Sequence, residues 1–282
     1  MEMTMGLVKF VTFFDDANCT VLKPELLARY DIIACPVSYK YGGKPYFDGI
    51  NTNSEHFTEL SVNHPADISR QTFSPLLQIL YSKLSKQGYQ TVFVICPHSK
   101  FSDCYHEAVL AANRFYRNSS EADDELIIRV IDSKTVGIGT MLHTLKAARS
   151  YHNYIYPASI LERNVKADAR AGKTYIIAEN SSSFSREKSL QAFMIQENRI
   201  LPLDISESTD EVRYDHFADI VCRAIANGGG KYAVSFGCRC SFSANILGRI
   251  KIKTKLTPTA VASYGILTTS ALGASAFCIH IQ

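Results

Sequence analysis

The sequence contains no tryptophan and no marked excess of charge of either sign. Lys and Arg number 30 and Asp and Glu number 27, which leaves a formal net charge of +3 at pH 7. A nucleic-acid-binding surface needs a clustered basic face. The densest basic piece, KIKTK at residues 251–255, alternates in the manner of a solvated edge strand. We therefore expect no nucleic-acid partner, and a strand over residues 251–255.

The motifs of common enzyme classes are also missing. The sequence has no G-x-S-x-G, no H-E-x-x-H and no G-x-x-x-x-G-K-[ST]. The glycines of residues 137–139 begin a G-x-G-x-x-G pattern, but Leu142 takes the place of its last glycine. The eight histidines lack metal-ligand spacing; we expect His98 to be a structural loop residue, and His106 and His143 to lie on helix surfaces. The sequence predicts no cofactor, no metal site and no catalytic residue.

No stretch is apolar enough to indicate a membrane span. Residues 256–282 contain no charged side chain, but Ser, Thr, Ala and Gly crowd them, which favours a buried strand followed by a small-residue loop. The first 14 residues lack the basic start and cleavage site of a secretory signal. Most of the eight cysteines lie in apolar runs, and Cys238 and Cys240 have no second pair with which to form a zinc site. We expect a cytoplasmic protein with reduced thiols.

The first half of the chain alternates between strand and helix patterns. The predicted strands cover 8–14, 32–41, 92–96 and 126–132, and the predicted helices cover 24–30, 54–62, 74–88, 103–118 and 140–152. Such alternation with short links is typical of an α/β domain with a mainly parallel sheet and flanking helices.

The second half reads differently. Strands are predicted at 174–180, 199–205, 231–238 and 249–255 and in the tail, with one long helix at 211–230. A boundary near residues 155–170 divides the chain into an N-terminal domain, 1–160, and a smaller α/β domain, 161–282. The predicted fold class is therefore a two-domain α/β protein.

Three loops that each precede a predicted helix share one composition. They are ISRQTFSP (68–75), PHSKFSD (97–103) and DSKTVGIG (132–139), and all offer hydroxyls and backbone N–H groups. Ligands collect at the carboxyl ends of parallel strands, and a helix N-terminus favours an anion. The loops therefore indicate a carboxylate or phosphate site. The alternative is that their Ser and Thr residues only cap helices, as Ser74 would ahead of Pro75.

Taken together, these loops resemble the DegV family of bacterial fatty-acid-binding proteins. PVSYKYGGKPYFDG (36–49) is similar to the family's PLSV…GxxYxDG stretch, and SRQTF (69–73) to its TSQPS loop. HSKFSDCYHEA (98–108) looks like the family's SSxLSGTYxxA run, and IIRVIDSKTVGIG (127–139) matches its DS and G-x-G parts. The four matches occur in order over residues 1–150.

The resemblance implies two α/β domains that enclose a long-chain fatty acid, and a protein that is no enzyme. Hydroxyls of the TSQPS-like and SSxLSGT-like loops would hold the carboxylate. The implied ligand-binding residues of this chain are Ser69, Gln71, Ser99, Ser102 and Thr269. In relatives the bound acid is presented to a separate fatty acid kinase, which makes such a kinase a candidate partner.

The second half departs from the family pattern. The family's GGRI reads ENRI here, with Arg199 as its one counterpart, and TSALGA (269–274) replaces the H-T-G-P-G-A loop. Asp103 stands where the second loop has Gly, and its carboxylate would repel that of the ligand unless it turns outward. Two other readings stay open: a serine-dependent acyl hydrolase or transferase, and a degenerate family member that binds no fatty acid.

Overall fold

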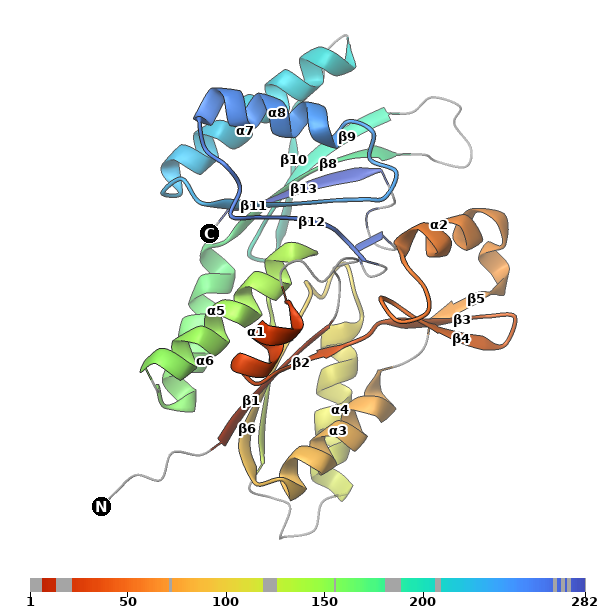
Figure 1. The fold of residues 1–282 in the computed structure, drawn as a ribbon, viewed down its shortest axis with the longest axis vertical. Coiled ribbons are helices and arrows are strands. Elements are labelled where there is room, and N and C mark those ends of the chain that lie inside the picture. The colour runs from red at the N-terminus through yellow and green to blue at the C-terminus, as the bar shows by residue number, and fades with distance from the viewer. Residues whose placement is uncertain are drawn as a thin grey trace.

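The computed structural model describes residues 7–13, 22–70, 73–118, 126–154, 156–180, 189–205, 209–265, 268–269, 272 and 275–281. They form two α/β units stacked end to end, each built on its own sheet, with a small antiparallel sheet beside the first unit (Figure 1). The predicted α/β class, with a parallel sheet flanked by helices, is confirmed.

The first sheet is wholly parallel, with the strand order β2-β1-β6-β7. Its strands are Leu7–Phe13 (β1), Ile32–Cys35 (β2), Tyr89–Cys96 (β6) and Ile127–Asp132 (β7). The last six residues of β6 are all buried, as expected of a central strand covered on both faces. The carboxyl ends of these strands point toward the second, six-stranded sheet, so the loops that follow them face that sheet (Figure 1).

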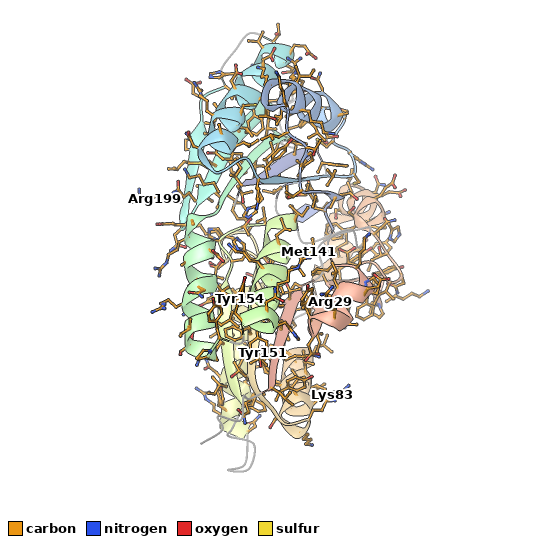
Figure 2. The ribbon with its side chains drawn as sticks, turned by 60° about the vertical axis from the view of Figure 1, so that its left-hand side comes forward. Arg29, Lys83, Met141, Tyr151, Tyr154 and Arg199 are labelled. Carbon is orange, nitrogen blue, oxygen red and sulfur yellow. The ribbon has the colours of Figure 1, made fainter. Side chains whose placement is uncertain are left out.

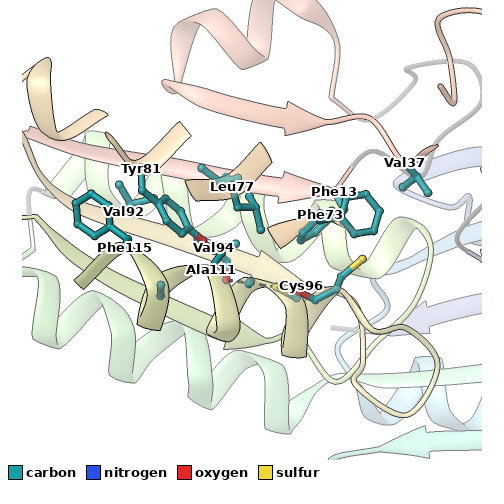
Figure 3. Close-up of a cluster of buried hydrophobic side chains, with 14 of the residues drawn as sticks. Phe13, Val37, Phe73, Leu77, Tyr81, Val92, Val94, Cys96, Ala111 and Phe115 are labelled. Atoms are coloured by element: carbon teal, nitrogen blue, oxygen red, sulfur yellow. Dashed lines mark hydrogen bonds between the residues drawn. The ribbon is translucent and has the colours of Figure 1, made fainter. Parts of the chain in front are cut away.

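Helices cover both faces of this sheet. One face packs on α3 (Ser74–Lys86) and α4 (Cys104–Asn118), where Leu77, Tyr81 and Leu84 form the buried stripe (Figure 3). The other face packs on the helices α1 (Pro24–Arg29), α5 (Ile138–Tyr154) and α6 (Ala158–Ala171). Each large apolar side chain buried in such a core contributes about 1.5–3 kcal/mol.

The predicted strand over 32–41 is two strands. It breaks at Pro36, and the continuation pairs within a small antiparallel sheet of order β4-β3-β5 instead. Its strands are Ser38–Tyr41 (β3), Lys44–Phe47 (β4) and Ile68–Arg70 (β5). Gly42 and Gly43, with φ of +56° and +77°, make the two-residue hairpin turn. Between β4 and β5 run α2 (Ser54–Asn63) and a 3-10 turn, Pro65–Asp67.

The second sheet has six strands in the order β10-β9-β8-β13-β11-β12, and every neighbouring pair except β11 and β12 is antiparallel. The strands are Lys173–Asn180 (β8), Ser189–Gln196 (β9), Arg199–Leu203 (β10), Tyr232–Phe236 (β11), Ala260–Ser263 (β12) and Ala276–Ile281 (β13). Helices α7 (Asp210–Asn227) and α8 (Ser243–Thr254) cover its outer face. The tail that lacks charge thus supplies two strands: β13, which is wholly buried, and the edge strand β12, in which only Ala262 is buried.

The predicted strand at 249–255 is wrong, because these residues belong to helix α8 and its end. Ile246 and Ile250, one helical turn apart, are buried against the sheet. The cations on the exposed side pair with acidic residues of α7, as in the contact between Lys253 Nζ and Asp219 Oδ1 at 2.7 Å. Alternation of Lys and Ile there reflects an exposed helix end and not a strand.

The proposed domain boundary at 160/161 falls inside α6, which packs on α5 and β7. The division itself stays a prediction. None of the helices within the described residues is both long and apolar enough to cross a membrane.

Candidate functional site

Two of the three predicted loops lie side by side at the carboxyl edge of the parallel sheet. The backbone N–H of His98 donates to the carbonyl oxygen of Thr135 at 2.8 Å. Ser99 N donates to Asp132 Oδ2 at 3.2 Å, and Lys134 Nζ lies 2.7 Å from the same oxygen. Burial raises the pKa of Asp132, but the hydrogen bonds from Lys134 and Ser99 outweigh it and hold that pKa below its usual value. Asp132 is therefore ionised, and its carboxylate links the two loops.

The loop that follows β6 also reaches the second sheet. The rings of Phe101 and Phe193 stack with centroids 6.4 Å apart, and Lys100 Nζ donates to the carbonyl oxygen of Asn198 at 2.6 Å. Asp103 is exposed. An exposed carboxylate is screened by water, so Asp103 does not by itself bar an anion from the loop.

The predicted hydroxyls of this loop have distinct settings. Ser102 is buried, and its Oγ accepts a hydrogen bond from the N–H of Cys104 at 3.2 Å at the start of α4. Ser99 is half-buried and contributes its backbone N–H to Asp132. Neither hydroxyl hydrogen-bonds to a histidine side chain, the arrangement a serine nucleophile requires. His98 is fully buried, and burial lowers the pKa of its ring.

The first predicted loop is described only in part. Gln71 and the side chain of Ser69 lie outside the described residues, and their roles stay predictions. Phe73 is buried and meets Phe13 edge to face at 5.1 Å between ring centroids. The prediction that Ser74 caps α3 is wrong, since Phe73 holds the cap position and Ser74 is the first helical residue.

The reason is that a carboxylate from another helix takes over the cap. Ser74 N donates to Glu107 Oε2 at 3.0 Å, and this acidic group lies at the N-terminus of α3, where the helix dipole favours it. At α2, by contrast, the cap is local, because Asn53 Oδ1 accepts from His56 N at 2.9 Å.

In the third loop, Gly137 has a φ of +55°, which lies in the left-handed region. A methyl group on Gly137 would lie 3.0 Å from Ser235 Oγ and 3.5 Å from Thr268 Oγ1. Thr269, the predicted ligand residue, donates its Oγ1 hydrogen to the carbonyl oxygen of Gly265 at 2.8 Å. Its role stays a prediction, and Ser235 and Thr268 are site residues that the sequence did not indicate.

Apolar side chains of the second sheet pack against the loops of the parallel sheet and form an apolar layer with them. Its buried members come from the third loop and from four strands or their ends: Val136, Ile176, Ile195, Tyr264, Ala276 and Cys278. Phe101, Phe193 and Leu272 pack against it. The layer therefore joins the second loop, the third loop and the C-terminal segment in one apolar surface.

A groove of about 560 Å³ opens at the β9–β10 edge of the second sheet. Its lining is mainly apolar and consists of Leu190, Gln191, Ala192, Phe193, Ile200, Pro202, Leu203, Asp204, Ile205 and Arg213. Its volume falls in the range of small-molecule sites. Phe193 belongs both to this groove and to the apolar layer. Arg199 lies exposed on β10, at the margin of the molecule (Figure 2).

A buried polar network lies next to these loops, where α5 meets the second sheet. Thr135 Oγ1 and Thr174 Oγ1 are 2.7 Å apart, and Thr174 Oγ1 is 3.1 Å from His280 Nδ1. The ring of His143 meets that of His280 at 5.2 Å between centroids. The prediction of a surface position for His143 is wrong: it is 3% exposed, because the second sheet covers the first half of α5.

Among the described residues, no group of three or more His, Cys, Asp or Glu side chains could hold a metal ion. Asp132 and Lys134 pair with each other, and the backbone N–H groups of His98, Ser99 and Lys100 already donate within the loops. The polar groups that remain at the site are hydroxyls and the start of α5. Their partners by chemistry are a carboxylate or a similar small anion, with an apolar body beside it.

These features define an α/β fold in which the loops of a parallel sheet face a second, mixed sheet. Sequence comparison identifies its family. A family model described as "Uncharacterised protein, DegV family" matches residues 14–186, more than half of the chain. The chain belongs to the DegV family.

Individual relatives match over part of their length. A DegV domain-containing protein of Clostridium perfringens is 30% identical over 146 residues, which is 51% of this chain and 48% of the relative. One from Caldanaerobacter subterraneus is 30% identical over 125 residues, 44% of this chain and 41% of the relative. The matched stretches therefore span less than half of these curated relatives.

Solved structures match over nearly the whole chain at low identity. Bacillus subtilis DegV, described as a fatty acid binding protein, superposes with a TM-score of 0.74 and 18% identity over 98% of both chains. A stearic-acid-binding protein of Eubacterium ventriosum gives 0.77 and 13% over 98% of both chains. A DegV family protein of Eubacterium eligens loaded with heptadecanoic acid gives 0.73 and 10%, over 98% of this chain and 99% of the other. These matches show that the fold is shared over nearly the whole chain.

Proposed function

We propose that the protein binds a long-chain fatty acid between its two domains and acts as a binding protein, not as an enzyme. The observation that carries this is the meeting of the 97–103 and 132–137 loops with the apolar layer at the domain boundary. Fatty acids need this pairing of a few polar donors at one end with an apolar wall. The fatty acids named for the solved relatives support the same assignment.

In this proposal the carboxylate lies at the loops and the alkyl chain follows the apolar layer toward the β9–β10 groove. Phe193 belongs to both surfaces and stacks on Phe101 of the second loop, which supports a continuous path. Neutral donors and a helix N-terminus suffice for one carboxylate, because such hydrogen bonds to a charged acceptor are the stronger kind.

Native mass spectrometry of the freshly purified protein is the direct test. We expect one adduct of fatty-acid mass per chain, recovered by extraction and identified by lipid analysis. Ser69→Ala is expected to weaken or abolish the adduct if its hydroxyl contacts the head group, whereas Ser82→Ala, on the exposed side of α3, should retain it. A protein that carries no lipid and ignores added palmitate and oleate would contradict the proposal.

The same proposal has three further parts: the absence of ester hydrolysis, a cytoplasmic location and a kinase partner. A panel of acyl esters should show no turnover above that of a Ser69→Ala, Ser102→Ala double variant, because neither Ser99 nor Ser102 has a histidine to act as base. We also propose a cytoplasmic location, supported by the free thiols of the described cysteines, and a fatty acid kinase as the acceptor of the bound acid.

A further inference from the structure

Ser235 occupies an unusual position for a hydroxyl. It lies in β11 within the apolar run YAVSF and is 0% exposed. Along β11, Val234 faces the helices α7 and α8, and Ala233 faces α5 on the other side. Because side chains alternate along a strand, Ser235 points to the same side as Ala233, toward α5. Its buried Oγ has no hydrogen-bond partner among the residues that the structure describes. An unsatisfied buried hydroxyl costs free energy, and this points to a ligand that uses it.

The group opposite Ser235 is the start of helix α5. A methyl group on Gly137 would lie only 3.0 Å from Ser235 Oγ, so the hydroxyl sits against the backbone at which the helix begins. α5 has 17 residues, and its dipole presents partial positive charge at this end. The N–H groups of Gly139 and Thr140 already donate to the carbonyl oxygens of Val136 and Gly137 at 3.2 Å. Thr268 Oγ1 lies 3.5 Å from the same point, so a second hydroxyl borders this place.

The charge of the surroundings favours an anion that is small and singly charged. Lys134, three residues before Gly137, is held by Asp132 at 2.7 Å and so is already neutralised within the loop. Two apolar residues border the place: Val136 and Cys278 belong to the buried layer, and Cys278 pairs with Ser235 from the neighbouring strand β13. The polar network of Thr135, Thr174 and His280 lies one step further along α5. Hydroxyl and backbone donors in an apolar setting suit a carboxylate that continues into an alkyl chain.

We propose that Ser235 donates a hydrogen bond to the carboxylate of the bound fatty acid at the N-terminus of α5. This inference rests on the proposed function and adds a residue of the second domain to its head-group site. Both domains then hold the same carboxylate, the first through the start of α5 and the second through Ser235. Ligand binding consequently stabilises the domain interface, because it satisfies a donor that the protein alone leaves unpaired.

The test is the affinity of Ser235→Ala for palmitate and for methyl palmitate. Loss of a hydrogen bond to a charged group should weaken palmitate binding about 10-fold or more. Methyl palmitate has the same chain without the charge, so its affinity should change much less. Without ligand, the melting temperature of the variant should stay the same or rise, since the hydroxyl has no protein partner to lose.

The matched control is Ser243→Ala on α8, whose Oγ donates to the carbonyl oxygen of Cys240 at 3.0 Å. It should lower the melting temperature slightly and leave palmitate affinity unchanged. Ser235→Cys, of similar size with a weak S–H donor, gives the same comparison if the alanine variant does not fold.

Each outcome separates the two proposals. Wild-type protein that binds no fatty acid overturns the proposed function. Wild-type protein that binds palmitate, with Ser235→Ala and Ser235→Cys binding it equally well, leaves the proposed function intact and overturns the role of Ser235. A variant that loses palmitate and methyl palmitate alike, or melts lower without ligand, assigns Ser235 to packing and also overturns it.

Discussion

Gly139→Ala is expected to lower the free energy of unfolding by about 3 kcal/mol, a large effect for one methyl group. The new Cβ would lie 2.2 Å from Thr135 Oγ1 and 3.0 Å from His280 Nδ1. Thr135 is buried and its hydroxyl contacts Thr174, so it cannot move aside without breaking the contact between the two domains. For a chain of this size the melting temperature should fall by roughly 5–10 °C in differential scanning calorimetry.

Helix propensity alone predicts the opposite sign for this substitution, since alanine is favoured over glycine by about 1 kcal/mol within a helix. Gly248→Ala on α8 is the matched control, because a methyl group there meets no heavy atom within 4 Å. We expect that control to melt at the same temperature as the wild type or higher. Equal stabilisation by both changes would show that α5 and the second sheet do not pack as closely as described.

The parallel sheet was predictable because its strands carry their own signal. Every residue of VFVIC is buried in β6, and Leu77, Tyr81 and Leu84 recur at helical spacing on α3. The tight turn at Gly42-Gly43 was likewise visible in the sequence. What the sequence did not indicate is how strand β3 pairs after Pro36, because both arrangements use the same alternating residues.

Helix α8 shows where local pattern fails. Lys251 to Lys255 alternate as a strand would, yet the residues that decide the structure are Ile246 and Ile250, which belong to the preceding helical turns. Its exposed end is stabilised by charges on α7, a helix about 30 residues earlier, as in the pair of Lys253 with Asp219. Contacts between distant segments of this kind override a five-residue pattern.

One part of the candidate site could be predicted from the sequence and another part could not. The 97–103 and 132–139 loops were predictable, since they follow adjacent parallel strands and must meet at one sheet edge. Ser235 and Thr268 were not, because each reaches Gly137 only through the order of the second sheet. The one signal in the sequence is a serine inside an otherwise apolar strand, YAVSF, which a core position does not favour.

Acid is expected to destabilise the protein between about pH 6.5 and pH 4 through the histidines that are buried where α5 meets the second sheet. Burial lowers the pKa of His143 to about 4 and that of His280 well below its ordinary value of 6.5. The unfolded chain therefore binds more protons in this window, and stability falls as the pH falls. Above pH 6.5 both rings are neutral in either state, so the contribution is fully present.

The charges that face the two rings act in opposite directions. On α5, Lys146 disfavours protonation of both His143 and His280, whereas Asp168 on α6 favours it at His143. Lys146 and Asp168 pair with each other at 2.8 Å, which leaves burial as the dominant cause. His143 alone should contribute on the order of 3 kcal/mol across the window, measured as the free energy of urea unfolding at pH 4.5, 5.5, 6.5 and 7.5.

His143→Leu separates this cause from general acid denaturation. Neither ring nitrogen of His143 has a hydrogen-bond partner, so an apolar side chain of similar size should keep the fold and flatten the dependence on pH. His106→Gln, at an exposed position on α4, should follow the wild-type profile. If His143→Leu loses stability with acid as steeply as the wild type, the histidine is not held neutral at the interface, and the domains must admit water there.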